Sequence, residues 1–111
     1  MKIKEIKLGL IYIVSLSGPF IKEQLAPLVN ILDRTLSSGN RRVLIDLKEV
    51  PLIDSAGLEL LWDTHIKYRK EGGMIKLVHP NPLVMDIFHA TKATNTFEIF
   101  QDQEKAYRSF R

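Results

Sequence analysis

The sequence contains no cysteine, which excludes a disulfide framework and any metal site built from thiolates. It also lacks an apolar stretch near the ~20 residues with which a helix crosses a bilayer, and no signal-peptide pattern follows its first residues. The three histidines, His65, His79 and His89, do not have the spacing of metal ligands. We therefore expect a cytoplasmic protein with no metal, no cofactor and no membrane partner.

An excess of charge of one sign is also missing. Sixteen Lys and Arg residues stand against thirteen Asp and Glu residues, so the formal net charge is only +3. The tightest basic groups are Arg41-Arg42 and the run of Lys67, Arg69 and Lys70. That run falls in the last turn of an expected helix, where cations complement the helix dipole. We therefore expect no direct contact with nucleic acid.

The residues that are present suit one hydrophobic core, and we expect a single domain over 1–111. Short apolar strands alternate with helical patterns. The patterns predict strands over 3–8, 10–16, 43–47, 75–78 and 97–100, and helices that begin near positions 25, 56, 84 and 103. Because the first two strands read as a hairpin, we predict an α/β fold. Its mixed β-sheet of four to five strands has about four helices packed against it.

The most informative stretch is 50–58, where an apolar run ends in a polar turn and a helical pattern begins. Ser55 lies at this junction, so its hydroxyl is expected near the surface. The free N–H groups of the helix start favour negative charge there. Two interpretations stay open for Ser55, a helix N-cap or a phosphorylated residue. For Asp54 we weigh positioning of the serine hydroxyl against hydrogen bonding to the amides of the turn.

Hydrolase chemistry at Ser55 does not fit its surroundings. The glycine that the nucleophile elbow of hydrolases carries two positions before the serine is missing, because Ile53 stands there. The sequence also has no glycine-rich phosphate loop. We therefore expect that the protein is not an enzyme.

The stretch Asp54-Ser55-Ala56-Gly57-Leu58, between a buried strand and a helix, resembles the STAS domain of bacterial anti-sigma factor antagonists. In that family the serine directly after the aspartate is phosphorylated by the anti-sigma factor, which is also a serine kinase. The resemblance implies a STAS-like sheet and a phosphorylation-controlled module. Unphosphorylated, the module would sequester the anti-sigma factor and so regulate transcription. It further implies a PP2C-type phosphatase as a second partner, and a monomer or weak dimer.

The resemblance also implies a partner-binding surface. It would comprise Asp54, Ser55, Ala56, Gly57 and Glu59, where the small residues after the serine let a kinase approach the hydroxyl. A phosphoryl group adds about −1.5 to −2 charges beside Asp54 and near Glu59. A partner that accepts the neutral hydroxyl would then face a dense anionic patch.

One loop departs from the family pattern. Family members that act as switches have an acidic turn of the Gly-Glu-Leu-Asp type after the second strand, whereas this chain has Gly18-Pro19-Phe20-Ile21. We expect Phe20 and Ile21 to present an apolar contact to a partner instead. The departure leaves an alternative open, a non-switching STAS scaffold or a regulatory protein that senses a small ligand.

Overall fold

A computed structural model describes residues 1–110 of the chain. Two β-strands, β1 (Lys2–Leu8) and β2 (Ile11–Ser17), come first. The rest of the chain follows in the order η1 (Lys22–Gln24), α1 (Ala26–Ser37), β3 (Arg42–Glu49), α2 (Ser55–Lys70), β4 (Met74–Val78), α3 (Pro82–Ala90), η2 (Ala93–Asn95), β5 (Ile99–Phe100) and α4 (Gln103–Arg108), where η marks a 3-10 helix. The predicted α/β fold with a mixed sheet and four helices is confirmed.

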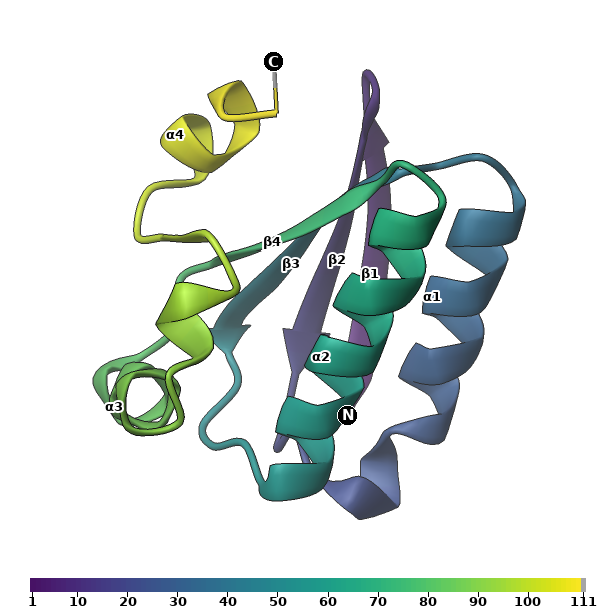
Figure 1. The fold of residues 1–111 in the computed structure, drawn as a ribbon. Helices are drawn as coiled ribbons and strands as arrows, with labels where there is room; N and C mark the ends of the chain where they lie inside the picture. Colours follow the sequence, from purple (N-terminus) through teal and green to yellow (C-terminus); the bar gives the residue numbers. More distant parts are fainter. Residues whose placement is uncertain (111) are drawn as a thin grey trace.

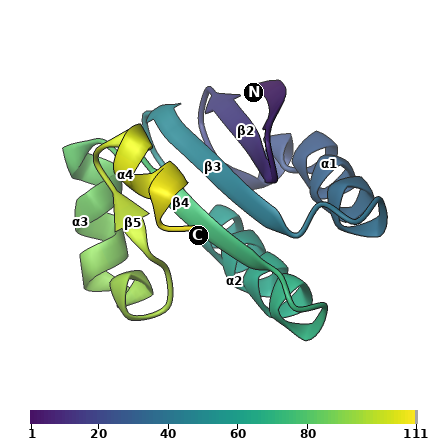
Figure 2. The same ribbon diagram turned by 90° about the horizontal axis from the view of Figure 1, so that it is seen from above.

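The sheet has the strand order β1-β2-β3-β4-β5. Strands β1 and β2 are antiparallel, and each later strand is parallel to its neighbour. Gly9 has a φ of +62° in the two-residue turn between Leu8 and Ile11, a backbone conformation that glycine adopts at little cost. Helices α1 and α2 lie side by side on one face of the sheet, and α4 lies on the other (Figures 1 and 2).

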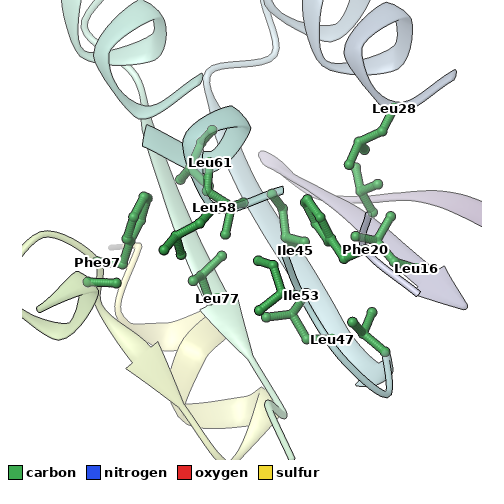
Figure 3. Packing of buried hydrophobic residues seen from close by; sticks show 14 of the residues in the cluster. Leu16, Phe20, Leu28, Ile45, Leu47, Ile53, Leu58, Leu61, Leu77 and Phe97 are labelled. Atoms are coloured by element: carbon green, nitrogen blue, oxygen red, sulfur yellow. The ribbon is translucent and has the colours of Figure 1, made fainter. Parts of the chain in front are cut away.

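The larger hydrophobic core fills the space between the sheet and α1 and α2. It includes Leu16, Ile45 and Leu77 from the strands and Leu28 and Leu61 from the helices (Figure 3). A smaller cluster lies on the opposite face, where Ala106 and Phe110 cover residues of β2, β3 and β4. Each central strand is therefore buried on both faces, which explains its nearly continuous apolar sequence.

A buried lysine attaches the C-terminal segment to this second face. The Nζ of Lys76 donates to the carbonyl oxygen and to Oγ of Ser109, both at 2.9 Å. It also pairs with Oε2 of Glu98 at 2.9 Å and lies 4.7 Å from the ring centroid of Phe110. Since only 6% of Lys76 is exposed, these partners are what make burial of its charge tolerable.

The strand and helix boundaries differ little from the predictions, with one exception. The last strand covers only Ile99–Phe100, whereas the prediction began at Phe97. Phe97 is buried in the larger core, and its ring makes a T-shaped contact with the His65 ring, with the ring centroids 5.3 Å apart. Its side chain is therefore fixed by packing before the chain joins the sheet.

Candidate functional site

The turn between β3 and α2 is held by both oxygens of one carboxylate. Oδ1 of Asp54 accepts from the backbone N–H of Gly57 at 2.8 Å, and Oδ2 accepts from the backbone N–H of Lys22 at 3.0 Å. These two hydrogen bonds hold the pKa of Asp54 below its usual value, and the bond from Gly57 has the larger effect. Asp54 is therefore the N-cap of α2, and of the two interpretations weighed for it, hydrogen bonding to backbone amides is the one the structure shows.

Ser55 is the first residue of α2, so its interpretation as the N-cap is wrong. The residue is exposed, and its hydroxyl makes no hydrogen bond with the part of the chain that the structure describes. It lies at the positive end of the helix dipole, beside N–H groups with no partner within the helix. The position suits a group that gains negative charge.

The loop after β2 lies directly beside this turn. The N–H of Gly18 donates to the carbonyl oxygen of Glu49 at 3.0 Å, and that of Phe20 to the carbonyl oxygen of Leu52 at 2.9 Å. In return the N–H of Asp54 donates to the carbonyl oxygen of Phe20 at 3.2 Å. Residues 18–22 and 49–57 therefore form one connected backbone unit around Ser55.

The prediction that Phe20 presents an apolar contact to a partner is wrong. Its side chain is fully buried in the larger core, and Figure 3 shows it among Ile45, Leu16 and Ile53 under the start of α2. The backbone of Phe20 forms an isolated parallel bridge with that of Ile53, beyond the ends of β2 and β3. Ile21, the other residue of the predicted apolar contact, is half-buried.

Gly57 also faces inward. A Cβ atom on this residue would lie 2.3 Å from Cδ1 and 2.5 Å from the carbonyl oxygen of Phe20. The glycine therefore allows α2 to approach the loop after β2, and the expectation that it opens a path for a kinase is wrong. Of the other residues predicted for partner binding, Glu59 is exposed and Ala56 is half-buried.

Sequence reasoning missed a residue on the far side of the turn. Nδ2 of Asn81 donates to the carbonyl oxygens of Val50 and Pro51 at 3.1 and 3.3 Å, while its Oδ1 accepts from the N–H of Val84. Asn81 thus caps α3 and holds the turn before Ser55. An asparagine directly before a proline at a helix start is a cap signal, although the signal does not reveal the contact with residues 50 and 51.

Two histidines of the described residues lie in contacts of other kinds than a metal site. Within residues 1–110 no three His, Asp or Glu side chains are placed to hold a metal ion. His79 pairs instead with Asp46, its Nδ1 lying 3.1 Å from Oδ1 of the aspartate, and His65 packs on Phe97. In the same described region no helix is long and apolar enough to span a bilayer.

The sequence matches the model of a known family, and the fold matches those of solved structures. The model of the STAS domain family matches residues 2–106. A protein of Thermotoga maritima assigned as an anti-sigma factor antagonist has a TM-score of 0.91 at 19% identity, over 96% of this chain and 92% of that one. The phosphorylated form of SpoIIAA from Bacillus has a TM-score of 0.78 at 13% identity, over 99% and 100%.

A further similar structure comes from another class of protein. A sulfate transporter family protein of Wolinella succinogenes has a TM-score of 0.74 at 18% identity, over 95% of this chain and 89% of that one. At such identities the likeness to all three structures is one of fold. No curated protein matches the chain in sequence.

Proposed function

Because the chain belongs to the STAS domain family, we propose that it is an anti-sigma factor antagonist whose binding is controlled by phosphorylation of Ser55. Acting as a single domain over 1–111 in the cytoplasm, it would bind an anti-sigma factor that is also a serine kinase. A PP2C-type phosphatase would restore the unphosphorylated state, and the domain would be a monomer or weak dimer. The observation that carries the proposal is the exposed, unbonded hydroxyl of Ser55 at the first position of α2.

The proposed switch follows from charge at that position. Asp54 is ionised at neutral pH, and the backbone N–H groups of Gly57 and Lys22 lower its pKa further below the usual value. A phosphoryl group on Ser55 adds about −1.5 to −2 charges next to it, with exposed Glu59 one turn further along α2. A partner surface that packs on the neutral hydroxyl would have to desolvate this cluster, which weakens binding strongly.

The phosphate would not need to unfold the domain. It would occupy the positive end of the α2 dipole, where an anion stabilises a helix. The contacts that build the site are made by Asp54 and by the backbone of residues 18–22, and none of them uses the hydroxyl of Ser55. The switch would therefore act by changing the surface that is presented to the partner.

We further propose that Ser55 has no catalytic role of its own. A serine nucleophile needs a base within hydrogen-bond reach, and the hydroxyl has no such partner within the described residues. The carboxylate of the preceding residue, Asp54, accepts hydrogen bonds from two backbone N–H groups instead.

The decisive experiment combines intact mass with binding. The protein is incubated with ATP and each candidate anti-sigma factor kinase of its source organism, beside Ser55→Ala and, as a matched control, Ser37→Ala at another exposed serine. We expect one phosphate on the wild type and on Ser37→Ala, none on Ser55→Ala, and a loss of affinity on phosphorylation. Ser55→Glu should reproduce that loss in part.

A second candidate function is supported by the loop after β2. The loop has no carboxylate between Gly18 and Ile21, and Phe20 is turned into the core. A non-switching scaffold, or a regulator that senses a small ligand, would bind its partner with the same affinity whether position 55 is Ser, Ala or Glu. That result, with no phosphate gained from any candidate kinase, would replace the switch by the scaffold.

A further inference from the structure

The β1–β2 hairpin ends in two leucines that the other described residues leave exposed. Leu10, in the turn, is 72% exposed, and Leu8 before it is 48% exposed. Figure 1 shows the hairpin projecting at one end of the molecule, while α2 begins with Ser55 at the other end. Two large apolar side chains on a protruding turn lack the covering expected of an ordinary loop in a folded domain.

Unpaired cations surround the same tip. Lys7 adjoins it in β1, while Arg41 and Arg42 arrive at it from the start of β3, because β3 pairs with β2 next to the hairpin. All three side chains are exposed, and none forms an ion pair within residues 1–110. Together with Leu10 they line a hollow of about 330 Å³. Glu71, beside Gly72 at its margin, leaves the group with a net positive charge.

The other side of the tip is apolar. A second hollow of about 370 Å³ lies between the hairpin and α4 and is lined by Leu10, Ile11, Tyr107 and Phe110, with Arg42 at its border. The hydroxyl of Tyr107 donates to the carbonyl oxygen of Leu8 at 3.3 Å, which ties the end of α4 to the hairpin. The tip therefore presents apolar and cationic groups on one continuous surface that we call the hairpin pole.

We propose that the hairpin pole docks the protein on an anionic phospholipid surface, with Leu8 and Leu10 entering the headgroup region. A bilayer interface accepts apolar side chains without a preformed pocket, whereas a folded acidic protein would need a cavity shaped for Leu10. Anionic headgroups attract cations that lie near the membrane surface, and Lys7, Arg41 and Arg42 flank the inserting tip. The proposal departs from the expectation of no membrane partner, which rested on the absence of an apolar stretch long enough to span a bilayer.

Docking in this way leaves the Ser55 surface free. Helix α2 runs over 16 residues, or about 24 Å, from Ser55 toward the hairpin pole. A docked molecule would present Ser55 away from the lipid, where a protein partner can reach it. The proposal does not rest on phosphorylation of Ser55, and it can be tested on the isolated protein.

The test is sedimentation of the full chain with vesicles of equimolar phosphatidylcholine and phosphatidylserine, and with vesicles of phosphatidylcholine alone. We expect binding to the anionic vesicles only, and a decrease in binding as salt is raised. Leu10→Ser should lower the partition coefficient about tenfold. The double variant Lys7→Gln, Arg41→Gln should weaken binding to anionic vesicles and lessen its dependence on salt.

Two variants far from the hairpin pole serve as matched controls. Leu83, in α3, is 55% exposed, and Lys48 is exposed at the opposite end of β3. Leu83→Ser and Lys48→Gln should bind the anionic vesicles as the wild type does. The proposal would be overturned if the wild type did not bind the anionic vesicles. It would also be overturned if Leu10→Ser and Leu83→Ser lost binding equally.

The membrane proposal would also be overturned if the hairpin pole bound a second copy of the chain or an acidic protein segment. A second copy of the chain would be identified by sedimentation velocity without lipid, if the wild type forms a dimer and Leu10→Ser is a monomer. Binding of a soluble glutamate-rich peptide to the wild type and not to Leu10→Ser, with no binding to vesicles, would identify an acidic protein segment.

Discussion

Gly57 lies so close to Phe20 that a Cβ atom on the glycine would be 2.3 Å from Cδ1 of the ring and 2.5 Å from the phenylalanine carbonyl oxygen. Such distances leave no room for a methyl group unless the start of α2 or the loop after β2 moves. Because Gly57 has no side chain, the turn that carries Ser55 can pack closely on Phe20.

The first prediction concerns Gly57→Ala. In a free helix this change stabilises by roughly 0.5–1 kcal/mol, but here we expect a loss of about 1–3 kcal/mol from overpacking. Urea unfolding measures the free energy difference. Ala56→Gly, one residue earlier in the same turn of α2, is the matched control and should cost about its helix propensity. A stabilised Gly57→Ala variant would show that the contact is not tight.

The second prediction concerns Asp54→Asn and pH. Because the N–H groups of Gly57 and Lys22 lower the pKa of Asp54 in the fold, the carboxylate stabilises the protein at pH values above its pKa in the unfolded chain. That stabilisation disappears as the pH falls through the lower pKa of the folded state. The urea midpoint of the wild type should thus exceed that of Asp54→Asn at pH 7 and approach it in acid. A constant difference between the two would contradict the prediction.

The third prediction concerns His65. The pKa of its imidazole is lowered mainly by burial and to a smaller extent by the positive charge of Arg69. Its Nδ1 is buried and has no hydrogen-bond partner within the described residues. Because the unfolded chain then binds a proton more readily than the folded one, stability should fall as the pH drops below the usual pKa of 6.5. His65→Phe should remove this part of the decrease between neutral and mildly acidic pH. Exposed His89→Gln is the control, and an unchanged profile in His65→Phe would refute the assignment.

The fourth prediction concerns the attachment of α4 through Lys76. Lys76→Ala removes both hydrogen bonds to Ser109 and the contact with the ring of Phe110, so α4 should be released more easily from the sheet. We expect a loss of about 1–3 kcal/mol and faster hydrogen exchange of the α4 amides. Lys105→Ala, at an exposed position of α4, should leave that exchange rate unchanged. Equal exchange in the two variants would mean that Lys76 does not attach the helix.

The elements that could be predicted from the sequence are those whose signals are local. The glycine between the first two strands and the polar residue before α4 each act within a few positions. The structure shows the hairpin and the start of α4 where they were predicted, and Asp102 is the cap of that helix. The helix after Asp54 was predicted to within one residue for the same reason. Hydrophobic periodicity was sufficient there because each helix faces a single sheet.

The inward position of Phe20 could not be predicted in this way. A single aromatic residue in a loop has no periodicity, and its burial is decided by Ile53 and Gly57, more than thirty positions away. A usable signal was present at Gly57, since a glycine in the first turn of a helical pattern indicates a close approach of another segment. The identity of that segment depends on the strand order of the sheet.

The two hydrogen bonds of Asp54 have a consequence for the chemistry at its neighbour. Each of its oxygens accepts from one backbone N–H, of Gly57 or of Lys22, and within the described residues neither accepts from the Ser55 hydroxyl. If a phosphoryl group is transferred in this arrangement, the proton acceptor would come from the enzyme that delivers the group. The timing of the modification would then be set by the visiting protein, with the serine as a passive acceptor.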